Sequence, residues 1–142
     1  VARARGNLDD AETAFREGLQ IARDLAKRTD TPDSLRDLSV SLDRVGDVAR
    51  ARGNLDDAET AFREGLQIAR DLAKRTDTPE SQRDLLVSLY RLIVLAIARG
   101  DGAGARAALG EAEGMVPGLP DWMRGEAEKV FAALREAVAG LS

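Results

Sequence analysis

One long stretch of this chain is written twice. VARARGNLDDAETAFREGLQIARDLAKRTDTP occupies residues 1–32 and returns without a change at residues 48–79. A weaker match relates residues 33–52 to residues 80–99 at the same offset of 47 residues. A period of roughly 20–50 residues is typical of stacked helical arrays, in which each unit buries its apolar face against the next. The duplication therefore predicts a repeat protein.

Each unit is predicted to contain two helices, and in the full repeat the first helix is predicted over residues 33–52. Its apolar positions step by three and four along the chain, which is the spacing of one helix face. They are Leu35, Leu38, Leu42, Val45 and Ala49. We expect Thr31 to cap the N-terminus and Pro32 to occupy the first helical position, where a missing N–H is harmless. Gly53 is expected to end the helix.

The second helix is predicted to follow at once, with Asn54 as its N-cap and about 22 residues of length. Its apolar stripe comprises Leu55, Ala58, Phe62, Leu66, Ala69, Leu72 and Ala73. Asp56 and Asp57 would lie in the first turn, where the helix dipole favours negative charge. We expect Asp9 and Asp10 likewise to be acids at a helix start. They are not predicted to be a catalytic pair, because adjacent helical residues point about 100° apart and do not converge on a substrate.

The last part of the chain departs from the repeat. Gly46 and Phe62 are replaced by Ile93 and Leu109, and the second helix of this unit shortens to about residues 103–115. Pro117 and Pro120 break the chain before a final helix over about residues 121–139. The apolar face of that helix is predicted to be Trp122, Met123, Ala127, Val130, Phe131, Leu134 and Val138. A terminal helix of this kind would cap the array.

Ten small and apolar residues fall at the spacings of the tetratricopeptide repeat (TPR) signature. They are Leu42, Val45, Gly46, Ala49, Gly53, Leu55, Ala58, Phe62, Gly65 and Leu66. The resemblance covers nearly all of residues 1–112, although Leu42 replaces the usual tryptophan and Arg70 the closing proline. The long unit resembles TPR variants of kinesin light chains and of bacterial signalling proteins. A small residue at Gly46 would let the first helix approach Phe62 closely.

The resemblance implies an all-α fold: a right-handed α-solenoid of TPR-like helical hairpins with a C-terminal capping helix. We expect one array over residues 1–142. It divides into a partial repeat (1–32), a full repeat (33–79), a degenerate repeat (80–116) and the capping helix (117–142).

By the same resemblance, the first helices line a concave groove that holds a peptide or helix of a partner. The candidate groove residues are Val40, Asp43, Asp47 and Arg50 in one unit and Val87, Tyr90, Val94 and Ile97 in the next. Carboxylates beside an apolar surface suit a partner with basic and hydrophobic residues. An alternative remains open, in which the final helix covers Tyr90, Val94 and Ile97 with its aromatic side chains.

The stripe of Leu8, Ala11, Phe15 and Leu19 is a candidate self-association face. Residues 1–5 correspond to only the final turn of a first helix, so the stripe lacks the helix that covers its copy. Either further repeats precede it in a larger multidomain protein, or two chains meet there as a homo-oligomer.

The composition argues against chemistry. The 142 residues contain no cysteine and no histidine, which removes disulfides, the usual zinc sites, thiol nucleophiles and the commonest general base. The glycines of residues 100–104 follow no strand and precede no Gly-Lys-Ser/Thr, so they do not indicate a phosphate loop. We therefore predict no catalytic, metal or cofactor-binding residue, no cofactor, and no enzyme.

The partner class follows from charge and hydropathy. Net charge is −4 with acids and bases interleaved, which is not the basic surface that nucleic acid requires. Apolar runs are too short to span a membrane. We expect a cytoplasmic, bacterial protein-binding scaffold, with a structural spacer or self-associating array as the alternative.

Overall fold

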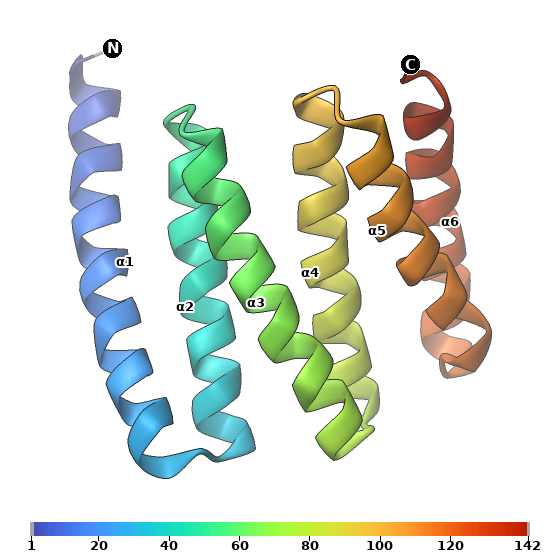
Figure 1. Ribbon diagram of the computed structural model, residues 1–142, viewed down its shortest axis with the longest axis horizontal. Coiled ribbons are helices and arrows are strands. Elements are labelled where there is room, and N and C mark those ends of the chain that lie inside the picture. The colour runs from blue at the N-terminus through green and yellow to red at the C-terminus, as the bar shows by residue number, and fades with distance from the viewer. Residues whose placement is uncertain (1, 142) are drawn as a thin grey trace. The chain divides into compact units, whose positions relative to one another are not determined.

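A computed structural model describes residues 2–141. Over these residues the chain forms six α-helices, one short 3-10 helix and no strand (Figure 1), which confirms the all-α helical-repeat fold. Contacts divide the chain into two compact units, and the boundary between them in the sequence falls between Thr76 and Asp77. The predicted single array over residues 1–142 stays a prediction, and its first and last residues lie outside the described part.

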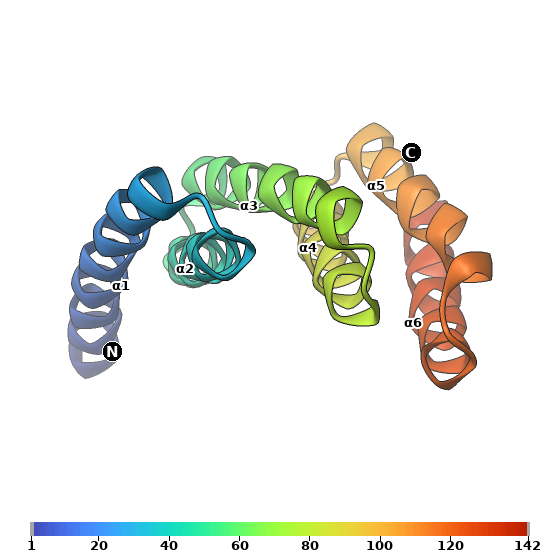
Figure 2. The ribbon, with the colours of Figure 1, turned by 90° about the horizontal axis from the view of Figure 1, so that it is seen from below.

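The first unit contains three helices, namely α1 (Ala2–Thr29), α2 (Pro32–Ala51) and α3 (Leu55–Thr76). The second contains α4 (Pro79–Ala98), α5 (Gly102–Met115), the 3-10 helix η1 (Val116–Gly118) and α6 (Asp121–Ala139). In the first unit α2 packs against both α1 and α3, and in the second α4 packs against both α5 and α6 (Figure 2). These bounds agree closely with the predicted helices from residue 32 onward.

Both α2 and α4 begin with a threonine cap followed by proline. The Ser34 N–H donates to Thr31 Oγ1 at 3.1 Å, and the Thr31 N–H donates to Ser34 Oγ at 3.1 Å. Thr78 and Ser81 repeat the arrangement at the start of α4. The predicted Thr31 cap is confirmed, and a serine occupies the position where glutamate or glutamine usually completes such a box.

Left-handed glycines turn the chain between the helices of each hairpin. Gly53 has φ of 82° and ends α2 as predicted, while Gly100 has φ of 71° at the matching place after α4. Gly102 and Gly104 are helical instead. Asp101 caps α5, where its carboxylate accepts a 2.9 Å hydrogen bond from the Gly104 N–H. Of the glycines in this short run, Gly100 therefore makes the turn.

Identical residues adopt two conformations in the two copies. Residues 49–57 contain a helix end, a turn and the start of α3, whereas α1 continues unbroken through Gly6 in residues 2–10. The prediction that residues 1–5 end one helix before another begins is therefore wrong. In the second copy Val48 and Ala49 are buried at the end of α2, and the chain reverses at Gly53, which has a positive φ.

Because α1 is continuous, the prediction that Asp9 and Asp10 lie at a helix start is wrong. Asp9 and Asp10 lie beyond the first turn of α1, which contains no acidic residue. The Asp9 carboxylate instead pairs with the Arg52 guanidinium, which also lies 3.3 Å from a carboxylate oxygen of Glu12. In α3, by contrast, Asp56 and Asp57 do occupy the first turn as predicted.

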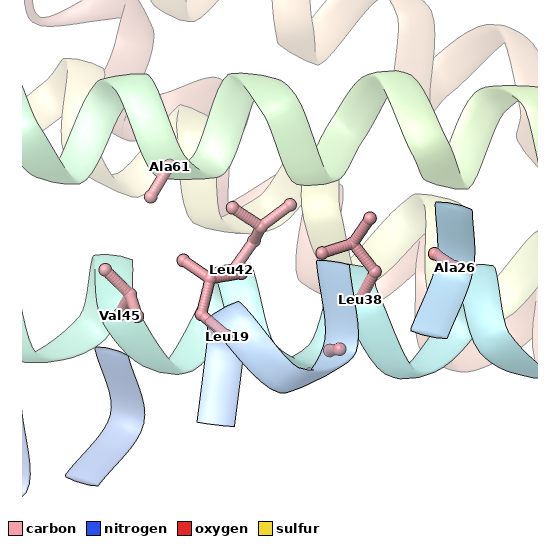
Figure 3. Packing of buried hydrophobic residues seen from close by; sticks show 7 residues of the cluster. Leu19, Ala26, Leu38, Leu42, Val45 and Ala61 are labelled. Carbon is pink, nitrogen blue, oxygen red and sulfur yellow. The ribbon is translucent and has the colours of Figure 1, made fainter. Parts of the chain in front are cut away.

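The core of the first unit is a cluster of small and branched side chains (Figure 3). It consists of Leu19, Ala22 and Ala26 from α1, Leu38, Leu42 and Val45 from α2, and Ala61 from α3. Beside it, Gly46 meets the ring of Phe62, which is only 1% exposed. A Cβ on Gly46 would lie 2.6 Å from Phe62 Cδ1, which confirms the predicted close approach.

The second unit buries a stripe of α6 beside α4 and α5. Met123, Ala127, Phe131 and Val138 are buried, at steps of four and seven residues. Trp122 was predicted on the same face, and this is wrong, because 72% of its surface is exposed. It stands about 100° around the helix from Met123, so it points away from the buried stripe.

A candidate partner-binding pocket

The helices α4 and α6 enclose an apolar pocket of about 520 Å³ within the second unit. Both helices contribute large apolar and aromatic side chains, with one charged residue from each. The lining consists of Arg83, Leu86, Val87 and Tyr90 from α4, and of Trp122, Met123, Glu126, Ala127, Val130 and Phe131 from α6. Leu86, Met123 and Phe131 are buried, whereas Val87, Tyr90 and Trp122 are exposed. The pocket thus has an apolar floor and an exposed aromatic rim.

The α4 wall of the pocket differs from the matching face of α2 at two positions. Where α2 has Ser39 and Asp43, α4 has Leu86 and Tyr90, and both line the pocket. Asp47 and Arg50 are also replaced, by Val94 and Ile97, but these two residues lie outside the pocket lining. The face that is polar in one unit is therefore apolar in the other, and the turn of helix at Tyr90 presents this face to α6.

The rim carries two aromatic side chains that suit a binding surface. Tyr90 is 43% exposed and Trp122 is 72% exposed, one on each helix of the pocket. Both have a large apolar body with a polar tip, and such residues are enriched at protein interfaces and among the residues that contribute most to binding. Arg83 and Glu126 also line the pocket and could orient charged groups of a ligand.

Of the four groove residues predicted on α4, Val87 and Tyr90 line this pocket, while Val94 and Ile97 are half-buried and do not. The final helix packs beside α4, but it does not bury the tyrosine. Trp122 was expected to help cover this face, yet it stands at the rim. The sequence could not show this, because either aromatic residue fits the apolar periodicity of α6.

The four groove residues predicted on α2 lie in the first unit. Val40 is 38% exposed, and Asp47 and Arg50 are exposed. Asp43 is half-buried, and its Oδ1 lies 3.1 Å from the position that a Cβ on Gly65 would take. Asp43 is therefore part of the contact between α2 and α3, and not an open groove carboxylate.

The predicted self-association face is not uncovered. Leu8, Ala11 and Phe15 are half-buried and Leu19 is buried, and Phe15 and Leu19 pack with side chains of α2 in the core. Two large apolar side chains elsewhere on α1 are exposed, namely Ile21 at 69% and Leu25 at 37%. Sequence comparison could not find them, because their copies in α3 are identical and only the neighbours differ.

An ion pair joins α1 to α3. The guanidinium of Arg23 donates two hydrogen bonds to the Glu64 carboxylate, one of them 2.9 Å from Nη2 to Oε1. The hydrogen bonds raise the pKa of Arg23 above its ordinary value, partial burial opposes this, and the charge of Glu64 adds to it. Both side chains remain about one-third exposed, so solvent screens much of the attraction.

A family model described as "Tetratricopeptide repeat" matches residues 38–80, from within α2 through α3 to the start of α4. This segment is a tetratricopeptide repeat, as the sequence predicted. No curated protein and no solved structure matches the chain significantly. The closer likeness to kinesin light chains stays a prediction. A tetratricopeptide repeat points to a protein–protein interaction module.

Within residues 2–141, no helix has both the length and the apolar character that crossing a membrane requires.

Proposed function

We propose that the chain recognises a partner protein by binding its apolar side chains in the pocket between α4 and α6. The main support is a difference between the two units. Asp43 of α2 lies in the contact with α3, whereas the matching residue of α4 is the exposed Tyr90, which lines the pocket together with Trp122. Pockets of roughly 300–1,000 Å³ accept compact apolar ligands, and this one holds about 520 Å³. Burial of a partner's side chains against the two aromatics would supply the binding energy.

The partner that fits best is a peptide or amphipathic helix with apolar anchors and basic flanking residues. The apolar pocket walls favour apolar anchors, and the net charge of −4 favours a basic segment around them, since Arg83 and Glu126 give the pocket itself one charge of each sign. The mechanism is binding to a preformed surface, with no chemical step and no cofactor. The cytoplasmic and bacterial setting expected from the sequence stays a prediction.

The test uses two valines at matching positions of the two units. Val87 on α4 lines the pocket, whereas Val40 on α2 does not, and they are similarly exposed at 42% and 38%. A peptide that binds the chain would be selected from a random displayed library, and its Kd measured against both variants. Val87→Asp is expected to weaken binding at least tenfold, and Val40→Asp less than twofold. Circular dichroism would verify that both variants are helical. Equal effects of the two substitutions would show that the pocket is not the site.

Self-association is a second candidate function, favoured by the exposure of Ile21 on α1. Light scattering over a concentration series would distinguish it. A particle mass that rises with concentration, and that returns to the monomer value in Ile21→Asp, would favour an associating array. A constant monomer mass would exclude it over the range measured.

A further inference from the structure

A separate apolar face lies open on α1. Ala14, Gly18, Ile21 and Leu25 follow one another at steps of four, three and four residues, which places them on one side of the helix. Ala14, Ile21 and Leu25 are exposed. A Cβ built on Gly18 would meet no other heavy atom within 4 Å, so the space above the glycine is also open. The face is therefore accessible along about three turns of helix.

The structure shows what the same four residues contact when they are covered. Their copies in α3 are Ala61, Gly65, Ile68 and Leu72. Ala61 and Leu72 are each only 6% exposed, and Ile68 packs against the core cluster. Because the sequence around the two sets is identical, the difference in burial comes only from the neighbouring elements.

The covering element at Gly65 is α2. A Cβ on Gly65 would lie 3.7 Å from Leu42 Cβ and 3.7 Å from the Ser39 carbonyl oxygen. The Ser39 hydroxyl donates a hydrogen bond to the Gly65 carbonyl oxygen at 3.3 Å. The glycine thus lets the two helix backbones approach closely, and a serine, a leucine and a carboxylate at positions i, i+3 and i+4 of α2 surround it.

We propose that the open face of α1 is a docking site for a second helix of the α2 type. Such a helix presents a serine, a leucine and an acidic residue at positions i, i+3 and i+4, as Ser39, Leu42 and Asp43 do. Its leucine packs over Gly18 and beside Ile21, and its serine donates to the Gly18 carbonyl oxygen. The site is separate from the pocket between α4 and α6, and it stands whether or not that pocket binds a partner.

The first test uses the whole chain and a fluorescent synthetic peptide of residues 31–52, which contains α2 and its cap. Saturable binding is expected. Gly18→Leu should weaken it at least tenfold, because the leucine fills the space that the incoming helix needs. Gly110→Leu is the matched control, since Gly110 on α5 also has nothing within 4 Å of a Cβ. It should leave the Kd unchanged within twofold. Binding that survives Gly18→Leu would overturn the proposal.

A second measurement decides the outcome when the isolated peptide is too weakly helical to bind. Residues 31–47 are placed directly before residue 1, so that the sequence leading into Ala14 duplicates the sequence leading into Ala61. Amide hydrogen exchange around Ile21 should then slow at least tenfold relative to the parent chain. Gly18→Leu should abolish this protection, and Gly110→Leu should not.

Two results would show that an α2-type helix does not dock on this face of α1. One is the absence of both peptide binding and the slower exchange. The other is dimerisation of the unmodified chain that Gly18→Leu abolishes, because a second copy would then be the occupant.

Discussion

Because α2 and α3 approach closely at Gly46, the substitution Gly46→Ala should lower the free energy of unfolding, whereas glycine-to-alanine changes in helices usually raise it. Gly46 lies against the ring of Phe62, and the methyl group of alanine would be only 2.6 Å from Cδ1 and 3.1 Å from Cζ. Carbon atoms normally approach to about 3.5–4.0 Å, so the ring or a helix must move by about 1 Å. Phe62 is 1% exposed, so its ring is surrounded by protein and cannot move out into solvent.

The expected size of the effect comes from two opposing terms. Overpacking of a well-filled core costs about 1–3 kcal/mol. Replacing a helical glycine by alanine contributes about 1 kcal/mol in the opposite direction. Gly46→Ala should therefore lower the free energy of unfolding by about 1 kcal/mol net. Gly18→Ala is the matched control on α1, because its methyl group enters open space, and it should raise stability by about 1 kcal/mol.

Urea unfolding followed by circular dichroism would measure both variants. The difference between them, about 2 kcal/mol, isolates the contact with Phe62 from helix propensity. If Gly46→Ala raised the free energy of unfolding as much as Gly18→Ala, the ring of Phe62 would not resist a methyl group at this position.

The second unit offers a natural form of the compensating change. At the positions of Gly46 and Phe62 it has Ile93 and Leu109, both buried. Phe62→Leu should therefore relieve the clash, so that Gly46→Ala costs less in that background. A double-mutant cycle should give a favourable coupling of at least about 1 kcal/mol. Additive effects would show that the two residues do not share the strained contact.

Three further predictions concern helix ends and charge. Thr31→Ala removes the acceptor of the Ser34 N–H and should lower the free energy of unfolding by about 1 kcal/mol in urea; a loss below about 0.3 kcal/mol would contradict the cap. Asp30 has φ of 45°, which suits glycine better, so Asp30→Gly should raise stability by about 0.5–1 kcal/mol, and a lower melting temperature would count against it. Glu64→Gln should cost at most about 1 kcal/mol, and less in about 1 M salt. Because the pKa of Arg23 is raised, the stability that this pair contributes is complete below the pKa of unfolded arginine and is lost only as the pH rises through the folded value. The effect of Glu64→Gln should therefore be equal near pH 7 and pH 10, and a smaller effect at the higher pH would contradict it.

Features with local signals could be predicted from the sequence. Thr31 and Pro32 mark a helix start and Pro117 the break before α6, because a capping hydroxyl and a proline ring act on the adjacent backbone. Gly53 permits the left-handed φ that ends α2, but Gly6 in the same local sequence stays helical, so packing also decides there. The close approach at Gly46 was also predictable, since a family pattern placed it opposite Phe62.

Features that depend on neighbours could not be predicted. The continuous α1 differs from residues 48–79 only in what packs against it, and so do the burial of Phe15 and the exposure of Ile21. The sequence predicted the α4 side of the pocket but not its α6 side. Tyr90 was identified from its position, but the outward direction of Trp122 depends on which side of α6 meets α4 and α5.

The shared sequence of α1 and α3 also has a consequence for folding. The side chains of α2 cannot distinguish the two helices, because Phe15 and Phe62 lie in identical surroundings along the chain. Only the connections discriminate, namely the turn at Gly53 on one side and the link at Asp30 on the other. At high concentration α3 of one molecule can take the same place in another, which makes the first unit prone to domain swapping during refolding. The second unit differs here, because Ile93 and Leu109 are buried at the positions of Gly46 and Phe62, and its helices are no longer copies of one another. Divergence of a repeat thus gives each hairpin an identity that a perfect copy lacks.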